Sequence, residues 1–122
     1  MLKDHDSSAI VAVGDIERAG RFYTDILGLD LLENRGEVLT YRTGNTRLVV
    51  YRSDYAGTNQ ANAVAWGVGE DIETIAADLA AKGVTFEQYE GMERMGNLYV
   101  AGDFKMVWFK DPDGNILHLN NG

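Results

Sequence analysis

The order of apolar and polar residues divides the chain into short strand-like segments and two helix-like segments. Short runs rich in β-branched and aromatic residues, bounded by Gly, Asp or Asn, predict strands. These runs cover residues 8–13, 29–33, 38–43, 46–52, 63–68, 84–87, 98–101, 104–110 and 115–119. Apolar residues at helical spacing predict helices over residues 16–27 and 72–82. The pattern therefore predicts a chain of mixed α and β structure.

Each predicted helix has a start and a stop signal. Asp15 and Asp71 stand at the two starts, where a carboxylate can cap the free amide groups of the first turn. Gly28 and Gly83 follow the two last turns, as expected for residues in a left-handed conformation. Between the last two strands, the only proline precedes Asp113-Gly114, which predicts a tight turn.

The two halves of the chain repeat one pattern. Residues 11–17 (VAVGDIE) are similar to residues 66–73 (WGVGEDIE), with one extra residue at the turn. Each half then reads as strand, helix and three strands, which indicates an internal duplication. We expect a single α+β domain, 1–122, built from two tandem βαβββ modules, at about 7–53 and 62–120. Their sheets are predicted to form a curved mixed sheet, a half-barrel around a cavity, with the helices outside.

Composition and charge narrow the classes of partner. Eleven basic and nineteen acidic residues give a net charge of −8, which argues against nucleic acid and favours neutral or cationic ligands. No stretch approaches the roughly 20 apolar residues of a membrane span, so no membrane partner is expected. The first residues lack the apolar run of a signal peptide, which predicts a cytoplasmic protein.

Four separated motifs resemble one family. They are residues 13–19 (VGDIERA), Phe22-Tyr23, Leu27-Gly28-Leu29 and residues 109–115 (FKDPDGN). In this order they resemble the vicinal oxygen chelate superfamily, which includes glyoxalase I, extradiol dioxygenases, fosfomycin-resistance enzymes and bleomycin-binding proteins. The resemblance implies the same fold, a small-molecule ligand and, because relatives are commonly dimers, a homodimer. These motifs lie in helices and turns, so they indicate a fold and not a reaction.

The resemblance also implies where a metal would be bound. The matching positions are Ser8, Val50, Ala63 and His118. A catalytic divalent site needs about three ligands from His, Asp, Glu or Cys, and only His118 is of this kind. No metal and no other cofactor is therefore predicted, although a divalent metal held by a non-standard set of residues stays an alternative.

Period-2 alternation anchored on these positions predicts the face of the cavity. The predicted cavity residues are Ser8, Ile10, Val50, Arg52, Ala63, Ala65, Met106, Trp108, Ile116 and His118. Small residues leave room at the metal positions, and the apolar lining suits a small, mostly apolar or aromatic ligand. Arg52 could pair with a carboxylate of that ligand. His118 is the candidate for a general base, since the pKa of histidine lies near neutrality.

Three functions are compatible with these residues. The first is a metal-independent binding protein that sequesters a drug or metabolite, in the manner of bleomycin-resistance proteins. The second is a lyase, isomerase or dioxygenase that uses His118 with a non-standard metal site or as a base. The third is a regulatory or partner-binding domain without a small ligand, in which Trp108 and Met106 fill the cavity.

Overall fold

The computed structural model describes residues 1–122 and confirms the α+β architecture. Its strands are β1 (Ala9–Val13), β2 (Asp30–Asn34), β3 (Val38–Thr43), β4 (Thr46–Arg52), β5 (Asn62–Gly67), β6 (Glu93–Met95), β7 (Leu98–Ala101), β8 (Phe104–Lys110) and β9 (Ile116–Asn120). Its main helices are α1 (Ile16–Arg21), which continues into a π-helical segment η2 (Phe22–Ile26), and α2 (Ile72–Ala81). Short 3₁₀ turns are η1 (Leu2–Asp4) and η3 (Gly69–Asp71). None of these helices has the length and apolar character that a membrane span requires.

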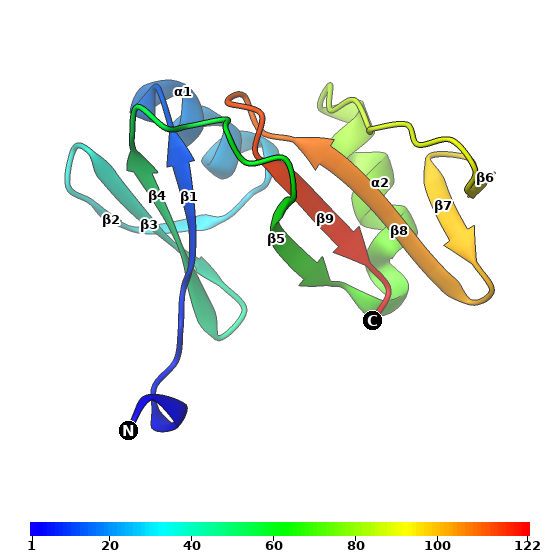
Figure 1. Cartoon of the computed structure of the whole chain (residues 1–122), viewed down its shortest axis with the longest axis horizontal. Helices are drawn as coiled ribbons and strands as arrows, with labels where there is room; N and C mark the ends of the chain where they lie inside the picture. Colours follow the sequence, from blue (N-terminus) through cyan, green and yellow to red (C-terminus); the bar gives the residue numbers. More distant parts are fainter.

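The strands form two open sheets that lie next to each other (Figure 1). The first, called sheet A here, has the order β1-β4-β3-β2, and the second, sheet B, has the order β5-β9-β8-β7-β6. In each sheet the first strand of the module runs parallel to the last strand of the module. The other strand pairs are antiparallel. The N-terminal arm extends away from sheet A (Figure 1).

One hydrophobic core joins the two modules. Every second residue of the central strands points toward the helices, as in Val11 and Val13 of β1 and Leu117 and Leu119 of β9. These side chains and the apolar faces of α1 and α2 belong to a single cluster of 17 buried residues. The opposite face of each sheet carries the intervening residues, so the sheets separate a helix side from an open side.

The second module departs from the predicted strand order. Residues 84–87 do not form a strand, and only Phe86 makes an isolated bridge, to Phe109. A strand that was not predicted forms at residues 93–95, where β6 pairs antiparallel with β7. The guanidinium of Arg94 lies 5.5 Å from the ring centre of Tyr99, which gives this Gly- and Met-rich hairpin a contact across the pair.

The helix starts also differ from each other. Asp15 accepts a hydrogen bond from the amide of Arg18 at 3.1 Å, as expected for a cap. Asp71 makes no capping bond, because the 3₁₀ turn η3 precedes α2 and already orders the first turn. The predicted helix over residues 16–27 is present, but its second half is widened to π-helical bonding, with the amide of Leu27 bound to the carbonyl of Phe22 at 3.0 Å.

The turn between β8 and β9, residues 111–115, is bound to module one. Asp111 lies at its centre: one carboxylate oxygen accepts the hydroxyl of Tyr23 at 2.7 Å, and the other accepts the amides of Asp113 and Asn115. Burial and the adjacent carboxylate raise the pKa of Tyr23, so its hydroxyl stays protonated and donates. The side chain of Asn115 donates to the carbonyl of Ala12 at 2.7 Å.

Asp113 adds a second attachment of this turn. Its Oδ1 accepts the amide of Gly14 at 2.9 Å and the guanidinium of Arg18 at 2.8 Å. Gly57, in the loop between the modules, packs against the carbonyl of the same residue. Gly57 has φ +75°, and a Cβ placed there would overlap the Asp113 carbonyl oxygen. The turn therefore orders both the start of α1 and the connecting loop.

The hydrogen bond between Tyr23 and Asp111 predicts a loss of stability in Tyr23→Phe. The variant leaves a buried carboxylate oxygen without its hydroxyl donor, which should lower the free energy of unfolding by about 1.5–3 kcal/mol. Urea denaturation measures this change. Tyr41→Phe is the matched control: it is equally buried, but its hydroxyl contacts the neutral side chain of Thr24 at 3.0 Å. An equal loss in both variants would contradict the special role of Asp111.

Gly57→Ala tests the packing of the connecting loop. Gly36 also has positive φ, at +86°, but no atom lies within 4 Å of the place where its Cβ would stand. Both Ala variants suffer the strain of a left-handed residue, and only Gly57→Ala adds an overlap with backbone. Gly57→Ala should therefore lower the melting temperature clearly more than Gly36→Ala, as measured by circular dichroism.

Candidate functional site

The open side of sheet B carries the histidine and its neighbours. Ala65, Trp108 and His118 lie side by side on β5, β8 and β9, because His118 is the Cα partner of both other residues. Met106 and Ile116 follow the same alternation along β8 and β9. The structure thus brings five of the predicted cavity residues to one face.

Hydrogen bonds determine which ring nitrogen of the neutral His118 carries the proton. The amide of Gly122 donates to Oδ1 of Asn120 at 3.0 Å, which turns the NH₂ group of Asn120 toward Nε2 of His118 at 3.2 Å. Nε2 must then accept, so the ring proton is on Nδ1 and is donated to the carbonyl of Val107 at 3.1 Å. Both ring nitrogens are therefore used within the chain.

Burial keeps this imidazole neutral. His118 is only 8% exposed, and this desolvation lowers its pKa below the ordinary 6.5, although the bond to Val107 acts in the opposite direction. The folded state therefore favours the uncharged ring. Its contribution to stability is fully present above about pH 6.5 and is lost as the pH falls toward the lowered pKa.

Aromatic side chains surround His118. The indole of Trp108 stacks on the imidazole, with ring centres 4.7 Å apart and planes at 26°. Tyr89 meets the indole edge to face at 5.3 Å, and Tyr99 lies 5.9 Å from it. The hydroxyl of Tyr99 accepts the amide of Tyr89 at 2.6 Å, which ties the loop before β6 to this cluster. Tyr89, Tyr99, Trp108 and His118 are called the aromatic cluster below.

The sequence prediction did not include the two tyrosines as site residues. Tyr99 is the Cα partner of Met106, so the alternation on β7 and β8 places both on the open side. The alternation along β7 could therefore have identified Tyr99 from the sequence, if β7 had been paired with β8. Tyr89 lies outside any strand, and no periodicity in the sequence indicates its contact with Trp108.

On sheet A, two predicted cavity residues lie on the wrong face. Val50 is the Cα partner of Val11 and is fully buried in the core on the helix side. Arg52 follows the same alternation at the end of β4, and its guanidinium pairs with Asp54 at 2.8 Å. The open side carries Ile10 and its Cα partner Val49 instead, and Ile10 is 59% exposed.

The cause is an error of one residue in matching the modules. In sheet B, His118 pairs with Ala65, and the repeat aligns Ala65 with Ile10. Since Ile10 pairs with Val49, the residue that corresponds to His118 in module one is Val49 and not Val50. A shift of one residue moves every side chain of a strand to the other face.

Two hollows border the open side. One, of about 360 Å³, lies at the junction of β1 and β5 and is lined by Ile10, Val11, Ala12, Tyr51, Tyr55, Gly57, Thr58, Asn59, Asn62, Ala63 and Asn115. The other, of about 500 Å³, is lined by Gly57, Asn59, Gln60, Glu87, Gln88, Tyr89, Lys110, Gly114 and Ile116. In it Lys110 and Glu87 form an ion pair at 3.0 Å, which raises the pKa of Lys110.

The residues at the family's metal positions do not fit a divalent metal. Val49, which takes the position first assigned to Val50, and Ala63 have no donor atom, and Ser8 is exposed before the start of β1. His118 already accepts a hydrogen bond at Nε2. Nowhere in the chain do three His, Asp or Glu side chains gather closely enough to hold an ion. We therefore assign no chemical step to a metal.

A model of the Glyoxalase/Bleomycin resistance protein/Dioxygenase superfamily matches residues 7–119. The chain belongs to this superfamily. The resemblance of the four sequence motifs is thereby confirmed, and the match covers both modules.

Solved structures of superfamily type share the fold over nearly the whole chain. Oxidase ChaP-H2 is 26% identical with a TM-score of 0.73, and 97% of this chain and 93% of that chain are covered. Fosfomycin resistance protein FosX from Listeria monocytogenes, in complex with Mn(II) and sulfate, is 15% identical with a TM-score of 0.73 and coverage of 97% and 90%. Lactoylglutathione lyase from Agrobacterium tumefaciens is 16% identical with a TM-score of 0.70 and coverage of 95% and 92%.

The bonding of His118 predicts its titration. In Asn120→Asp a carboxylate oxygen replaces the NH₂ group that faces Nε2, so the protonated ring gains a partner and the pKa of His118 should rise. The pH dependence of the imidazole signals in NMR spectra gives the pKa of His118 in the unmodified chain and in the variant. The chain has two histidines, and the exposed His5 supplies a reference signal in the same sample. An unchanged or lowered pKa of His118 in the variant would contradict the contact between Nε2 and the side chain of residue 120.

Proposed function

We propose that this superfamily member binds a flat, mostly apolar small molecule on the open side of its sheets, next to the aromatic cluster, without a divalent metal. Sequestration of a drug or metabolite is the role that this binding would serve. The observation that carries the proposal is the hydrogen bonding of His118. Both of its ring nitrogens bind groups of the chain itself.

The metal-free part of the proposal is supported by the chemistry of the donor set. To bind a metal, His118 would have to give up the bond from Asn120 at Nε2. The partners that a metal then needs are absent from the family's other positions, where the chain has Ser8, Ala63 and Val49. One histidine is too few for a stable catalytic site.

The ligand's shape is suggested by the exposed parts of the open side. Trp108 remains half-buried in spite of its contacts with His118 and the two tyrosines, so part of the indole is accessible. The hollow of about 360 Å³ adds Ile10 and Tyr51 from sheet A. Aromatic and aliphatic walls with a few polar groups are typical of sites for small organic molecules. Planar aromatic ligands stack favourably on such rings.

The charge of the ligand is proposed to be neutral or positive. The chain carries a net charge of −8, which raises the local concentration of cations. Lys110 is the cationic side chain in the larger hollow, and Glu87 already pairs with it. Arg52, once a candidate for a ligand carboxylate, pairs with Asp54. No free cation thus faces the open side in either hollow.

Binding of two matched probes tests this proposal. Naphthalene-2-methylammonium and naphthalene-2-carboxylate have the same ring and opposite charges, and isothermal titration measures their affinities with and without EDTA. The cation should bind more tightly, with one site per chain, and EDTA should change nothing. Trp108→Leu should weaken binding by about tenfold or more, a loss of ~1.4 kcal/mol.

The second tryptophan provides the control. Trp66 lies on the helix side of sheet B, so Trp66→Leu should leave the affinity for the naphthyl cation unchanged. Weakening by Trp66→Leu and not by Trp108→Leu would place binding on the other side of the sheet. Stoichiometric Zn²⁺, Mn²⁺ or Fe²⁺ in the purified protein, lost in His118→Ala, would overturn the metal-free proposal.

An enzyme is the alternative, and two observations favour it. The match to Oxidase ChaP-H2 covers 97% of this chain at 26% identity. In addition, the lowered pKa leaves His118 neutral at pH 7, as a general base must be. A lyase, isomerase or oxidase that uses this base would lose turnover in His118→Gln but keep ligand affinity. A binding protein shows no turnover in either form.

The proposal includes a homodimer in the cytoplasm. Leu31 and Leu32, on the edge strand β2, are 44% and 48% exposed. A second copy that covers these residues would remove apolar surface from water. Sedimentation velocity that gives only the monomer mass at high concentration would exclude the dimer.

A further inference from the structure

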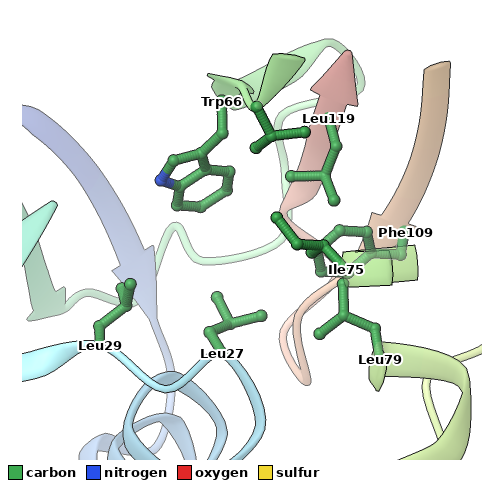
Figure 2. Close-up of a pocket in the computed structure, with 8 residues that line it drawn as sticks. Leu27, Leu29, Trp66, Ile75, Leu79, Phe109 and Leu119 are labelled. Carbon is green, nitrogen blue, oxygen red and sulfur yellow. The ribbon is translucent and has the colours of Figure 1, made fainter. Parts of the chain in front are cut away.

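A separate cavity of about 150 Å³ lies on the helix side of sheet B (Figure 2). Its floor is made by Leu79 of α2, Phe109 of β8 and Leu119 of β9, which are buried. Its mouth is lined by half-buried residues, which are Leu27, Leu29, Trp66, Val68 and Ile75. Leu27 and Leu29 belong to module one, so the cavity lies where the two modules meet.

The lining of this cavity excludes polar occupants. All eight residues are hydrophobic, and no charged or hydroxyl-bearing side chain reaches the interior. An ordered water needs about two to four polar partners, and the indole N–H of Trp66 is the only polar group among the lining side chains. A polar ligand would likewise lose its hydrogen bonds to water without replacement. An apolar ligand loses nothing and gains contacts with carbon atoms on every wall.

The size of the cavity limits its occupant to one ring. Cavities of about 150 Å³ lined by Leu, Ile and Phe stay dry and accept benzene or xenon. The cavity here has the same volume and the same kinds of lining residue. Its mouth is formed by half-buried side chains, which leaves an entry from solvent. Among them are Leu27, Leu29 and Trp66, which Figure 2 shows across the cavity from Phe109.

We propose that this cavity is a second binding site, specific for a benzene-sized hydrocarbon or halogenated aromatic molecule without hydrogen-bonding groups. It does not depend on the function proposed for the open side. Phe109 and Leu119 point into the cavity, whereas their chain neighbours Trp108 and His118 point to the opposite face. A ligand in the cavity therefore contacts β8 and β9 on the helix side, which is the face opposite to the aromatic cluster.

Tryptophan fluorescence with iodobenzene as the probe tests the site. Trp108→Phe leaves Trp66, at the mouth of the cavity, as the only tryptophan. The iodine atom of bound iodobenzene quenches the fluorescence of an indole that it contacts. Quenching of Trp66 fluorescence should therefore saturate as the probe is added. Phenol added as a competitor should displace iodobenzene at least about tenfold less effectively than benzene, because no lining side chain offers an acceptor for its hydroxyl proton. Quenching that rises linearly without saturation, or equal competition by phenol and benzene, would overturn the proposal.

Filling the cavity supplies the second test. Val68→Phe and Ile75→Phe each place a ring at the mouth, and both should abolish saturable quenching. Val84→Phe makes the same type of change at a half-buried valine outside the cavity and should leave quenching intact. Circular dichroism identifies any variant that fails to fold, in which case the other filling variant decides. Quenching that persists in a folded filling variant would place the probe elsewhere.

A second copy of the chain is the competing occupant. If Val68→Phe dissociated a dimer in sedimentation velocity, the cavity would be part of an interface between copies, and the small-ligand proposal would be wrong. If the oligomeric state of Val68→Phe equals that of the unmodified chain while saturable quenching is lost, the small apolar ligand is supported.

Discussion

The carboxylate of Asp111 is the group on which the arrangement of the modules depends. It lies in a turn of module two, and it is buried against Tyr23 of module one. A buried carboxylate is costly unless each oxygen has donors, and here backbone amides, an amide side chain and a phenol supply them. The modules must therefore meet at this point, because separating them would leave the charge without its phenol donor.

The same turn determines which parts of the chain surround the open side. Asn115 holds the end of β1 through the carbonyl of Ala12, and Gly57 holds the connecting loop near Asp113. The hollow between β1 and β5 includes Asn115, Gly57 and Ala12 in its lining. An inter-module attachment made for stability thus also shapes the candidate site.

Much of this architecture could be predicted from local signals. Asp15, Gly28, Gly83 and the turn after Lys110 are short-range features, and each has the expected place in the structure. The faces of β8 and β9 agree with the prediction, since His118 and Trp108 do share one side. These predictions needed only two signals. One is the two-residue period of side chains along a strand, and the other is the sequence repeat, in which the helix caps are easily identified.

Features that depend on pairing between distant strands were harder to predict. Val50 was placed on the open side because no residue in β4 marks its register with β1, and a run of aliphatic residues reads the same on both faces. Residues 84–87 have strand propensity, but they meet β8 only through the bridge of Phe86 to Phe109 and the bond from the amide of Glu87 to the carbonyl of Trp108. The contact of Tyr89 with Trp108 and the bonding of His118 to Asn120 arise from tertiary packing alone.

The duplication of the modules is broken at one pair of equivalent positions. Val49 of sheet A presents only methyl groups, while His118 of sheet B presents an imidazole bound to an amide. An exact pseudo-twofold site would accept a ligand equally well in two opposite directions. With this difference, any molecule that touches both sheets meets a hydrocarbon wall at one end and a polar wall at the other. The loss of symmetry therefore gives such a ligand a single preferred orientation.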